Sequence, residues 1–221
     1  MSDIKNRLLQ LKYGELSECC SAMMVEYNEC DISPVSKSEA LRYSGVPISK
    51  QDDTLDGEFD EICKIANNSF SYKVSYVVHP LYFDDGKPRL IFSHNSKSIT
   101  ENLEGSVGVV YFAATIGAGI DALIRKYEKI SPFKALLLQG LGAERVEALC
   151  DKFNGEVIKS ANEYGFNTAQ RFSPGYGDLS LEAQKTLLPL VNATKLLGIT
   201  LSESLLMAPS KSVTAIIGIK K

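Results

Sequence analysis

The segment SVGVVYFAATIG, residues 106–117, constrains the fold more than any other part of the chain. It is apolar almost throughout and rich in β-branched and aromatic residues, a composition typical of a strand covered on both faces. A second run of this kind, YKVSYVVHPLYF at 72–83, is followed by the turn-forming residues DDGKP. We expect RLIFS, residues 89–93, to return as the second strand of a hairpin. Residues 106–117 are then the central strand of a sheet with hairpin pairing.

Helical patterns surround these strands. The first thirty residues look amphipathic and helical, and a polar loop is expected at 49–58. The segment at 180–198 is expected to be a single helix capped by Ser180 and kinked at Pro189. Further helices are predicted at 33–46, ending at Gly45, and at 59–70, 98–105, 119–130 and 132–165, the last beginning at Pro132. The last residues, 200–221, predict two strands around APSKS. Hairpins mixed with blocks of helices indicate an α+β fold, with a mainly antiparallel β-sheet flanked by helices.

Composition excludes several classes of function. A net charge of −3 argues against a general nucleic-acid binder. The chain has no apolar run of the roughly 20 residues that span a bilayer, and its first residues lack a signal-peptide core, so we expect a cytoplasmic protein. Its five cysteines are odd in number and include no CxxC, which indicates free thiols in a reducing compartment. His79 and His94 end apolar runs, and we interpret both as structural rather than as metal ligands.

The segment VVYFAATIGAGIDAL resembles a dinucleotide-binding turn. Gly117, Gly119 and Ala122 form a GxGxxA that follows a strand and opens a helix. That fingerprint needs a second parallel strand ending in an acid about 20 residues later, and the sequence there is helical. We therefore expect a tight strand-to-helix turn. A self-sufficient methyltransferase built on this turn is kept as a distant alternative.

The loop RFSPGYGD, residues 171–178, is the best candidate binding site. The guanidinium of Arg171 offers two parallel hydrogen bonds to a carboxylate. Gly175 and Gly177 allow the backbone to approach a ligand closely, and Phe172 and Tyr176 can pack on a flat ring. The alternative is a loop whose arginine pairs with a surface acid and whose aromatic side chains finish the edge of a core.

The loop and the segment after it resemble the activation domain of cobalamin-dependent methionine synthase. The R-x-x-x-G-Y pattern of that family is matched by Arg171, Gly175 and Tyr176. Its L-T-E-S-x-x-M-x-P-x-x-S-V stretch is matched in order by Leu201, Glu203, Ser204, Met207, Pro209, Ser212 and Val213. The resemblance is specific over the last fifty residues and extends more loosely back to the strand at 106–117.

The resemblance implies a site for S-adenosylmethionine. Arg171 would grip the methionyl carboxylate, with Phe172, Gly175 and Tyr176 completing the loop. An acid on the preceding helix would face the ammonium, and Glu147 matches it best. The helical repeat puts Glu147 on one face with the small Ala143 and Cys150, whereas Glu144 looks exposed. We find no match to the second, N-terminal acid of the family or to its tyrosine-bearing segment beyond residue 221.

The implied role is the repair of cobalamin that has been oxidised to the inactive cob(II) state. One electron and a methyl group from S-adenosylmethionine would restore it. The cobalamin would be held by a partner, a methionine synthase or other corrinoid protein, and a flavodoxin-type protein is a candidate reductant. The chain would be an accessory component, inactive alone, with residues 1–35 as an N-terminal helical extension and 36–221 as the activation domain-like unit. The alternative is a small-carboxylate-binding or docking module with no catalytic role.

Overall fold

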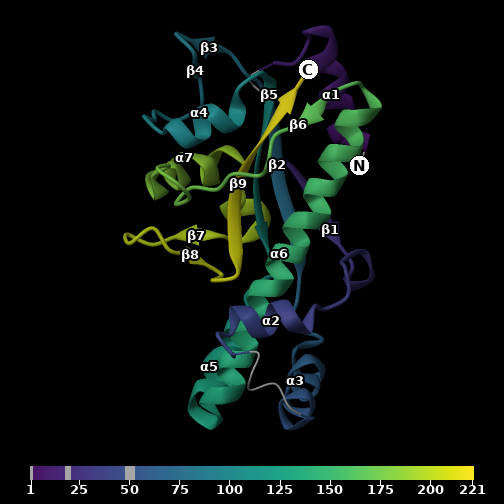
Figure 1. The fold of residues 1–221 in the computed structure, drawn as a ribbon, viewed down its shortest axis with the longest axis vertical. Helices are drawn as coiled ribbons and strands as arrows, with labels where there is room; N and C mark the ends of the chain where they lie inside the picture. The colour runs from purple at the N-terminus through teal and green to yellow at the C-terminus, as the bar shows by residue number, and fades with distance from the viewer. Residues whose placement is uncertain (1, 18–20, 48–52) are drawn as a thin grey trace.

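The computed structural model describes residues 2–17, 21–47 and 53–221, and its centre is one antiparallel sheet. The strand order is β1-β2-β5-β9-β6 (Figure 1). These strands are β1 (Met23–Tyr27), β2 (Tyr72–Pro80), β5 (Ser106–Thr115), β6 (Asn167–Thr168) and β9 (Ser212–Lys220). β5 lies in the middle, as its apolar sequence predicts, and the predicted α+β fold with a mainly antiparallel sheet is confirmed.

Alternation along the strands divides the core into two layers. On β5, Val110 and Phe112 face one cluster of buried side chains, whereas Val109 and Tyr111 face the other. The first cluster is covered by α1 (Ser2–Tyr13), α2 (Lys37–Tyr43), α3 (Asp53–Ala66), α5 (Gly119–Ile130) and α6 (Pro132–Glu163). The second is covered by α4 (Lys97–Leu103), α7 (Gln184–Leu190) and α8 (Ala193–Leu197). α6 and α7 therefore lie on opposite faces of the sheet (Figure 1).

The long helix α6 is continuous over 32 residues, with Pro132 at its start as expected. α2 crosses it at Gly140, in the first third of the helix. A Cβ on Gly140 would lie 2.2 Å from the carbonyl oxygen of Ala40, so only glycine permits this crossing. The low helix propensity of glycine is offset here by close packing between helices.

Next to this crossing lies a buried ion pair that the sequence analysis missed. The guanidinium of Arg145 donates to both carboxylate oxygens of Glu144, at 2.5 and 2.6 Å. Arg145 also donates to the carbonyl of Ser33, and Glu144 accepts from the amide of Ser36. Both side chains are buried, so the expectation that Glu144 is exposed is wrong. The pair fastens residues 33–36 to α6.

Several local predictions are corrected. The first thirty residues are not helical throughout, because Gly14 at φ +73° follows α1 and β1 then joins the sheet. The hairpin is only β3 (Phe83–Asp84) with β4 (Lys87–Pro88), and RLIFS is not its second strand. The amide of Arg89 still donates to the carbonyl of Tyr82, but that of Leu90 donates to the carbonyl of Pro88, a tight turn that takes the chain out of the hairpin. The division at residues 35 and 36 stays a prediction.

The structure also differs from two further predictions, the loop at 49–58 and the single helix at 180–198. α3 already begins at Asp53, and residues 48–52 lie outside the described part of the chain. The second segment is split into a 3-10 turn at Leu181–Ala183, α7 and α8. Pro189 lies in the last turn of α7, and Asn192 at φ +52° separates the two helices, so the expected kink is a break.

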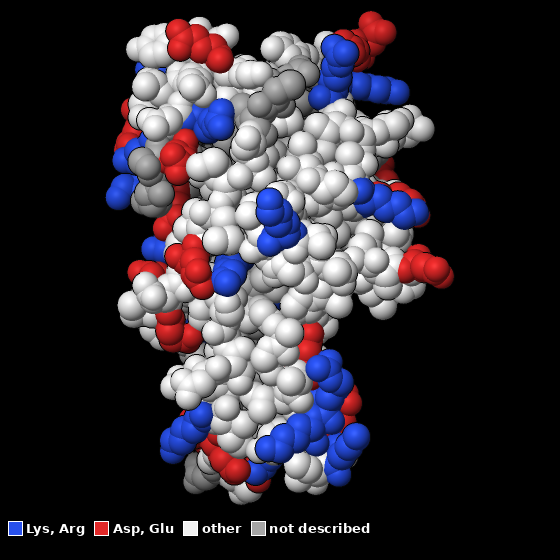
Figure 2. Space-filling model, turned by 180° about the vertical axis from the view of Figure 1, so that it is seen from behind, with Lys and Arg blue, Asp and Glu red and all other residues white. Residues whose placement is uncertain are grey.

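Two strands do flank APSKS, but they do not pair with each other. β8 (Met207–Ala208) pairs with β7 (Thr200–Leu201), while β9 joins the main sheet. Across the described residues, helices are either too short or too polar to cross a membrane. Figure 2 shows acidic and basic side chains interspersed among the described residues of the rear face.

Candidate functional site

The loop at 171–178 is fastened to the free side of β9. β6 pairs with β9 only at its end, through Asn167 and Thr168. Beyond this pairing, the amide of Phe172 donates to the carbonyl of Ile216 at 2.9 Å, and the amide of Ile216 donates back at 2.8 Å. Arg171 is therefore held beside β9 by the main chain of its neighbour.

A turn and a helix cap fix the rest of the loop. Gly175 and Gly177 have φ values of +91° and +55°, which glycine adopts without strain. Asp178 accepts hydrogen bonds from the Ser96 hydroxyl at 2.5 Å and from the amides of Lys97 and Ser98 at the start of α4. These bonds, with that from Ser96 the strongest, hold the pKa of Asp178 well below its usual value. The loop is thus held in place by contacts within the protein.

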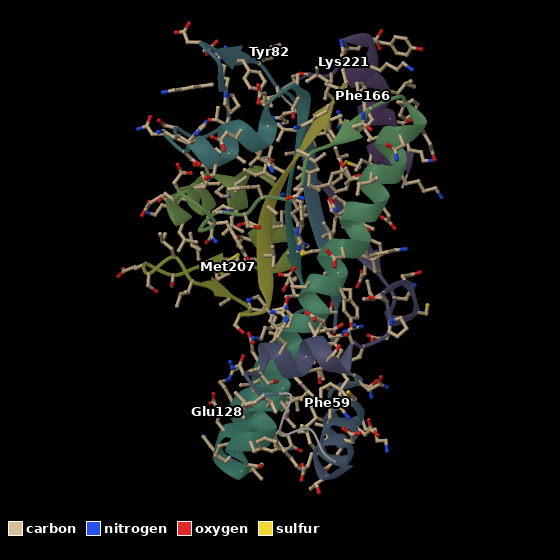
Figure 3. The ribbon with its side chains drawn as sticks, viewed as in Figure 1. Phe59, Tyr82, Glu128, Phe166, Met207 and Lys221 are labelled. Carbon is tan, nitrogen blue, oxygen red and sulfur yellow. The ribbon has the colours of Figure 1, made fainter. Side chains whose placement is uncertain are left out.

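A pocket of about 480 Å³ lies between this loop, α6, α7 and the start of β9. Met207, on the hairpin beside the lower half of β9, contributes to one wall (Figure 3). The complete lining is Glu147, Gln170, Arg171, Phe172, Ser173, Pro174, Tyr176, Gln184, Met207, Ser212, Val213 and Thr214. Since α6 and α7 cover opposite faces of the sheet, the pocket reaches around the edge of β9.

An ion pair inside the pocket joins two predicted site residues. The Nη2 atom of Arg171 lies 2.5 Å from the Oε2 atom of Glu147, and 3.7 Å from a carboxylate oxygen of Asp151. The side chains of Arg171 and Glu147 are 21% and 33% exposed. The Nη1 atom of Arg171 is buried and has no hydrogen-bond partner. The guanidinium therefore keeps an unused donor next to an acid.

Electrostatics keep the arginine charged and the nearby thiol neutral. Burial lowers the pKa of Arg171. Negative charges nearby raise this pKa by more, and they come from Cys150 when ionised, from Glu147 and from Asp151. Burial raises the pKa of the Cys150 thiol to about 12, so this thiol stays protonated at neutral pH. Cys150 therefore serves as packing beneath the ion pair rather than as a nucleophile.

Most of the predicted site residues come together in this pocket. Glu147, Arg171, Phe172 and Tyr176 line it, and Tyr176 is 68% exposed at its mouth. Gly175 does not line the pocket; it shapes the turn. The alternative interpretation of the loop paired its arginine with an acid, and in the structure that acid is Glu147.

Sequence reasoning missed several lining residues. Met207, Ser212 and Val213 belong to the segment that carries the family resemblance, and that segment was the available signal for them. Gln184 and Thr214 had no such signal, because one opens a short helix and the other looks like an ordinary strand residue.

The GxGxxA segment is a tight turn, as expected, and not a dinucleotide site. A Cβ on Gly119 would lie 2.4 Å from the carbonyl oxygen of Ser69, so the segment packs on the protein itself. The next element is α6, and β5 has antiparallel neighbours on both sides. Asp121 accepts hydrogen bonds from the amide and hydroxyl of Ser210, which fastens α5 to the loop before β9.

The histidines lie in protein contacts, as expected for structural residues. His79 packs edge-on against Tyr111, and the Nε2 atom of His94 lies 3.1 Å from the carbonyl oxygen of Pro88. Within the described residues no cluster of acids, histidines and cysteines is arranged to hold a metal ion. Cys30, Cys63 and Cys150 are free, while Cys19 and Cys20 lie outside the described residues.

The structure is an α+β domain with a pocket beside β9, lined by an arginine-bearing loop and a long helix. Comparison with protein families identifies the family within this class. The sequence model described as "Vitamin B12 dependent methionine synthase, activation domain" matches residues 96–221, more than half of the chain. The chain belongs to this family, as the resemblance predicted.

A solved structure shares the fold. It is described as "Crystal Structure of the MetH Reactivation Domain bound to AdoHcy", and its TM-score is 0.60 at 16% sequence identity. The match covers 91% of this chain and 79% of that one. At this identity the likeness concerns the fold alone. No curated protein matches the chain.

Proposed function

We propose that this protein binds S-adenosylmethionine in the Arg171 pocket and supports the reductive remethylation of cobalamin held by a partner protein. The observation that carries the proposal is the pairing of Arg171 and Glu147 within one pocket of a chain that belongs to the activation domain family. A relative with this fold was solved with AdoHcy, the product that remains when S-adenosylmethionine gives up its methyl group.

The charges of the pocket fit the amino-acid end of this ligand. An α-amino acid carries a carboxylate and an ammonium on one carbon, and Arg171 and Glu147 present the complementary charges side by side. The ligand would replace one ion pair by two, with the unpartnered Nη1 atom of Arg171 available to complete a two-bond grip on the carboxylate. A carboxylate ligand without an amine would instead compete with Glu147 for the arginine.

The role of this chain is to bind and orient. S-adenosylmethionine would supply the methyl group, while the cobalt and the electron come from a corrinoid protein, such as a methionine synthase, and from a flavodoxin-type or other one-electron donor. Tyr176, exposed at the mouth of the pocket, lies where a partner would approach. The chain therefore acts as an accessory component, and we expect no turnover from it alone.

The charge assignment of Glu147 can be tested with Glu147→Gln, which keeps the shape of the side chain and removes its charge. We expect binding of S-adenosylmethionine to weaken about tenfold, the lower end for a charge-assisted hydrogen bond, because the side chain is partly exposed. A des-amino analogue should bind at least as well as before, since the neutral amide no longer competes as an anion for Arg171. Calorimetric titration measures both affinities.

The matched control is Glu163→Gln, at the end of the same helix, where Glu163 pairs with Lys5 at the surface. This variant should bind both ligands as the wild type does. Equal losses for both ligands in Glu147→Gln, or no loss for either, would show that Glu147 does not face the ammonium. Binding of small carboxylates in preference to S-adenosylmethionine would favour the alternative of a carboxylate-binding module.

A further inference from the structure

Two buried polar side chains of the pocket have atoms without a hydrogen-bond partner. Gln184, at the start of α7, is 5% exposed, and its Oε1 atom has none. Thr214, on β9, is 2% exposed, and its Oγ1 atom also has no hydrogen-bond partner. Both residues line the pocket that contains Arg171.

Such atoms are unusual enough to need a reason. Nearly all buried polar atoms in folded proteins have a partner, since burial without one costs free energy. An apolar side chain of the same shape, such as valine for Thr214, would avoid this cost. A polar atom retained at a pocket wall is explained if a bound molecule supplies the missing partner.

The two residues lie on the opposite side of the sheet from Glu147. Thr214 is paired across the ladder with Ala113, which faces the second core cluster, and α7 packs on that cluster. Glu147 comes from α6, which packs on the first. A ligand held by both groups of residues would reach around the edge of β9.

The main chain of β9 is open at the same place. Ile216 exchanges its main-chain hydrogen bonds with Phe172, on the side away from β5. Thr214, two residues earlier, has the same orientation by the alternation of an antiparallel ladder. Within the described residues β6 pairs only with residues 219 and 220, so no strand covers Thr214 on that side.

We propose that Gln184 and Thr214 bind the nucleoside half of the ligand, while Arg171 and Glu147 bind its amino-acid half. This inference rests on the proposed function of the same pocket. The Oε1 atom of Gln184 accepts hydrogen bonds, so it requires an N–H or O–H of the ligand. Once the amino-acid group is bound at Arg171, the remaining donors of S-adenosylmethionine are its ribose hydroxyls and its purine amine.

The test uses variants that remove the polar atom and keep the shape, Thr214→Val and Gln184→Met, with Thr214→Ser as the control that retains the hydroxyl. The probes are S-adenosylmethionine and 5′-methylthioadenosine, which has the nucleoside without the amino acid. We expect Thr214→Val to raise the melting temperature by about 2 °C, because a buried unpaired hydroxyl is removed. The same variant, and Gln184→Met, should bind both probes roughly fivefold more weakly, the worth of a neutral hydrogen bond.

A higher melting temperature together with weaker binding in Thr214→Val distinguishes a ligand contact from a structural role, which would lower the melting temperature. Thr214→Ser should bind like the wild type, and Arg171→Ala should weaken S-adenosylmethionine while hardly changing 5′-methylthioadenosine. Wild-type affinity for 5′-methylthioadenosine in both Thr214→Val and Gln184→Met would overturn the inference, and so would lower melting temperatures for both. If the wild type binds neither probe, the proposed function fails as well.

Discussion

Gly119→Ala tests whether the turn after β5 is a structural junction. The added Cβ would lie 2.4 Å from the carbonyl oxygen of Ser69 and 3.1 Å from its carbonyl carbon and Cα. All three are backbone atoms, so relief requires a shift of the main chain at residue 69, and overpacking of this kind costs roughly 1–3 kcal/mol. Alanine recovers up to about 1 kcal/mol of helix propensity, less at the first residue of a helix. We therefore expect a net loss of about 1–2 kcal/mol, or roughly 2–8 °C in melting temperature.

The assay is thermal and urea denaturation, with Gly155→Ala in α6 as the matched control. Gly155 is exposed, and a Cβ there meets nothing within 4 Å, so this variant should gain up to about 1 kcal/mol. Binding of S-adenosylmethionine should be the same in folded Gly119→Ala and in the wild type. Wild-type stability in Gly119→Ala would refute the packing argument, and a selective loss of binding would revive the dinucleotide-type site.

Two further predictions concern charged groups. Asp178→Asn should lose stability at pH 7. Because the folded-state pKa of Asp178 is held below the ordinary value of 3.8, mainly by the Ser96 hydrogen bond, the difference from wild type in urea denaturation should narrow as the pH falls below about 4. Glu144→Gln should destabilise the protein by roughly 3–5 kcal/mol because it leaves the buried Arg145 charge unpaired. The control Glu39→Gln removes one partner of the exposed pair with Arg42 and should lower the free energy of unfolding by less than about 1 kcal/mol. Similar losses of stability in Glu144→Gln and Glu39→Gln would contradict the burial argument.

Local sequence patterns predicted most of the fold. The errors lie where contacts between residues far apart in the sequence determine the structure. The apolar run of β5 predicted a central strand because few other positions in a sheet bury both faces. RLIFS has an equally good strand composition, but the amide of Leu90 turns back to the carbonyl of Pro88, so residues after Arg89 leave the hairpin. β1 was missed because a short strand with only one buried residue, Tyr27, shows little apolar signal.

The site was predictable only in part for the same reason. Arg171 and Glu147 were found through a motif and the resemblance, yet their contact joins residues 24 positions apart and required coordinates. Glu144 was misjudged because its partners include Ser36, which no local pattern associates with α6. Whether the side-chain oxygens of Gln184 and Thr214 have hydrogen-bond partners depends on the residues packed around them, and no spacing in the sequence predicts that packing.

Calorimetric titration of S-adenosylmethionine into the wild type, Arg171→Lys and Arg171→Ala tests the central claim most directly. We predict one binding site in the wild type, about 10–100-fold weaker binding in Arg171→Ala, and partial recovery in Arg171→Lys, whose ammonium lacks the planar fork. Melting temperatures should change little, since Glu147 is exposed enough to be solvated when its partner is removed. A wild type that does not bind, or equal affinities in all three proteins, would contradict the account.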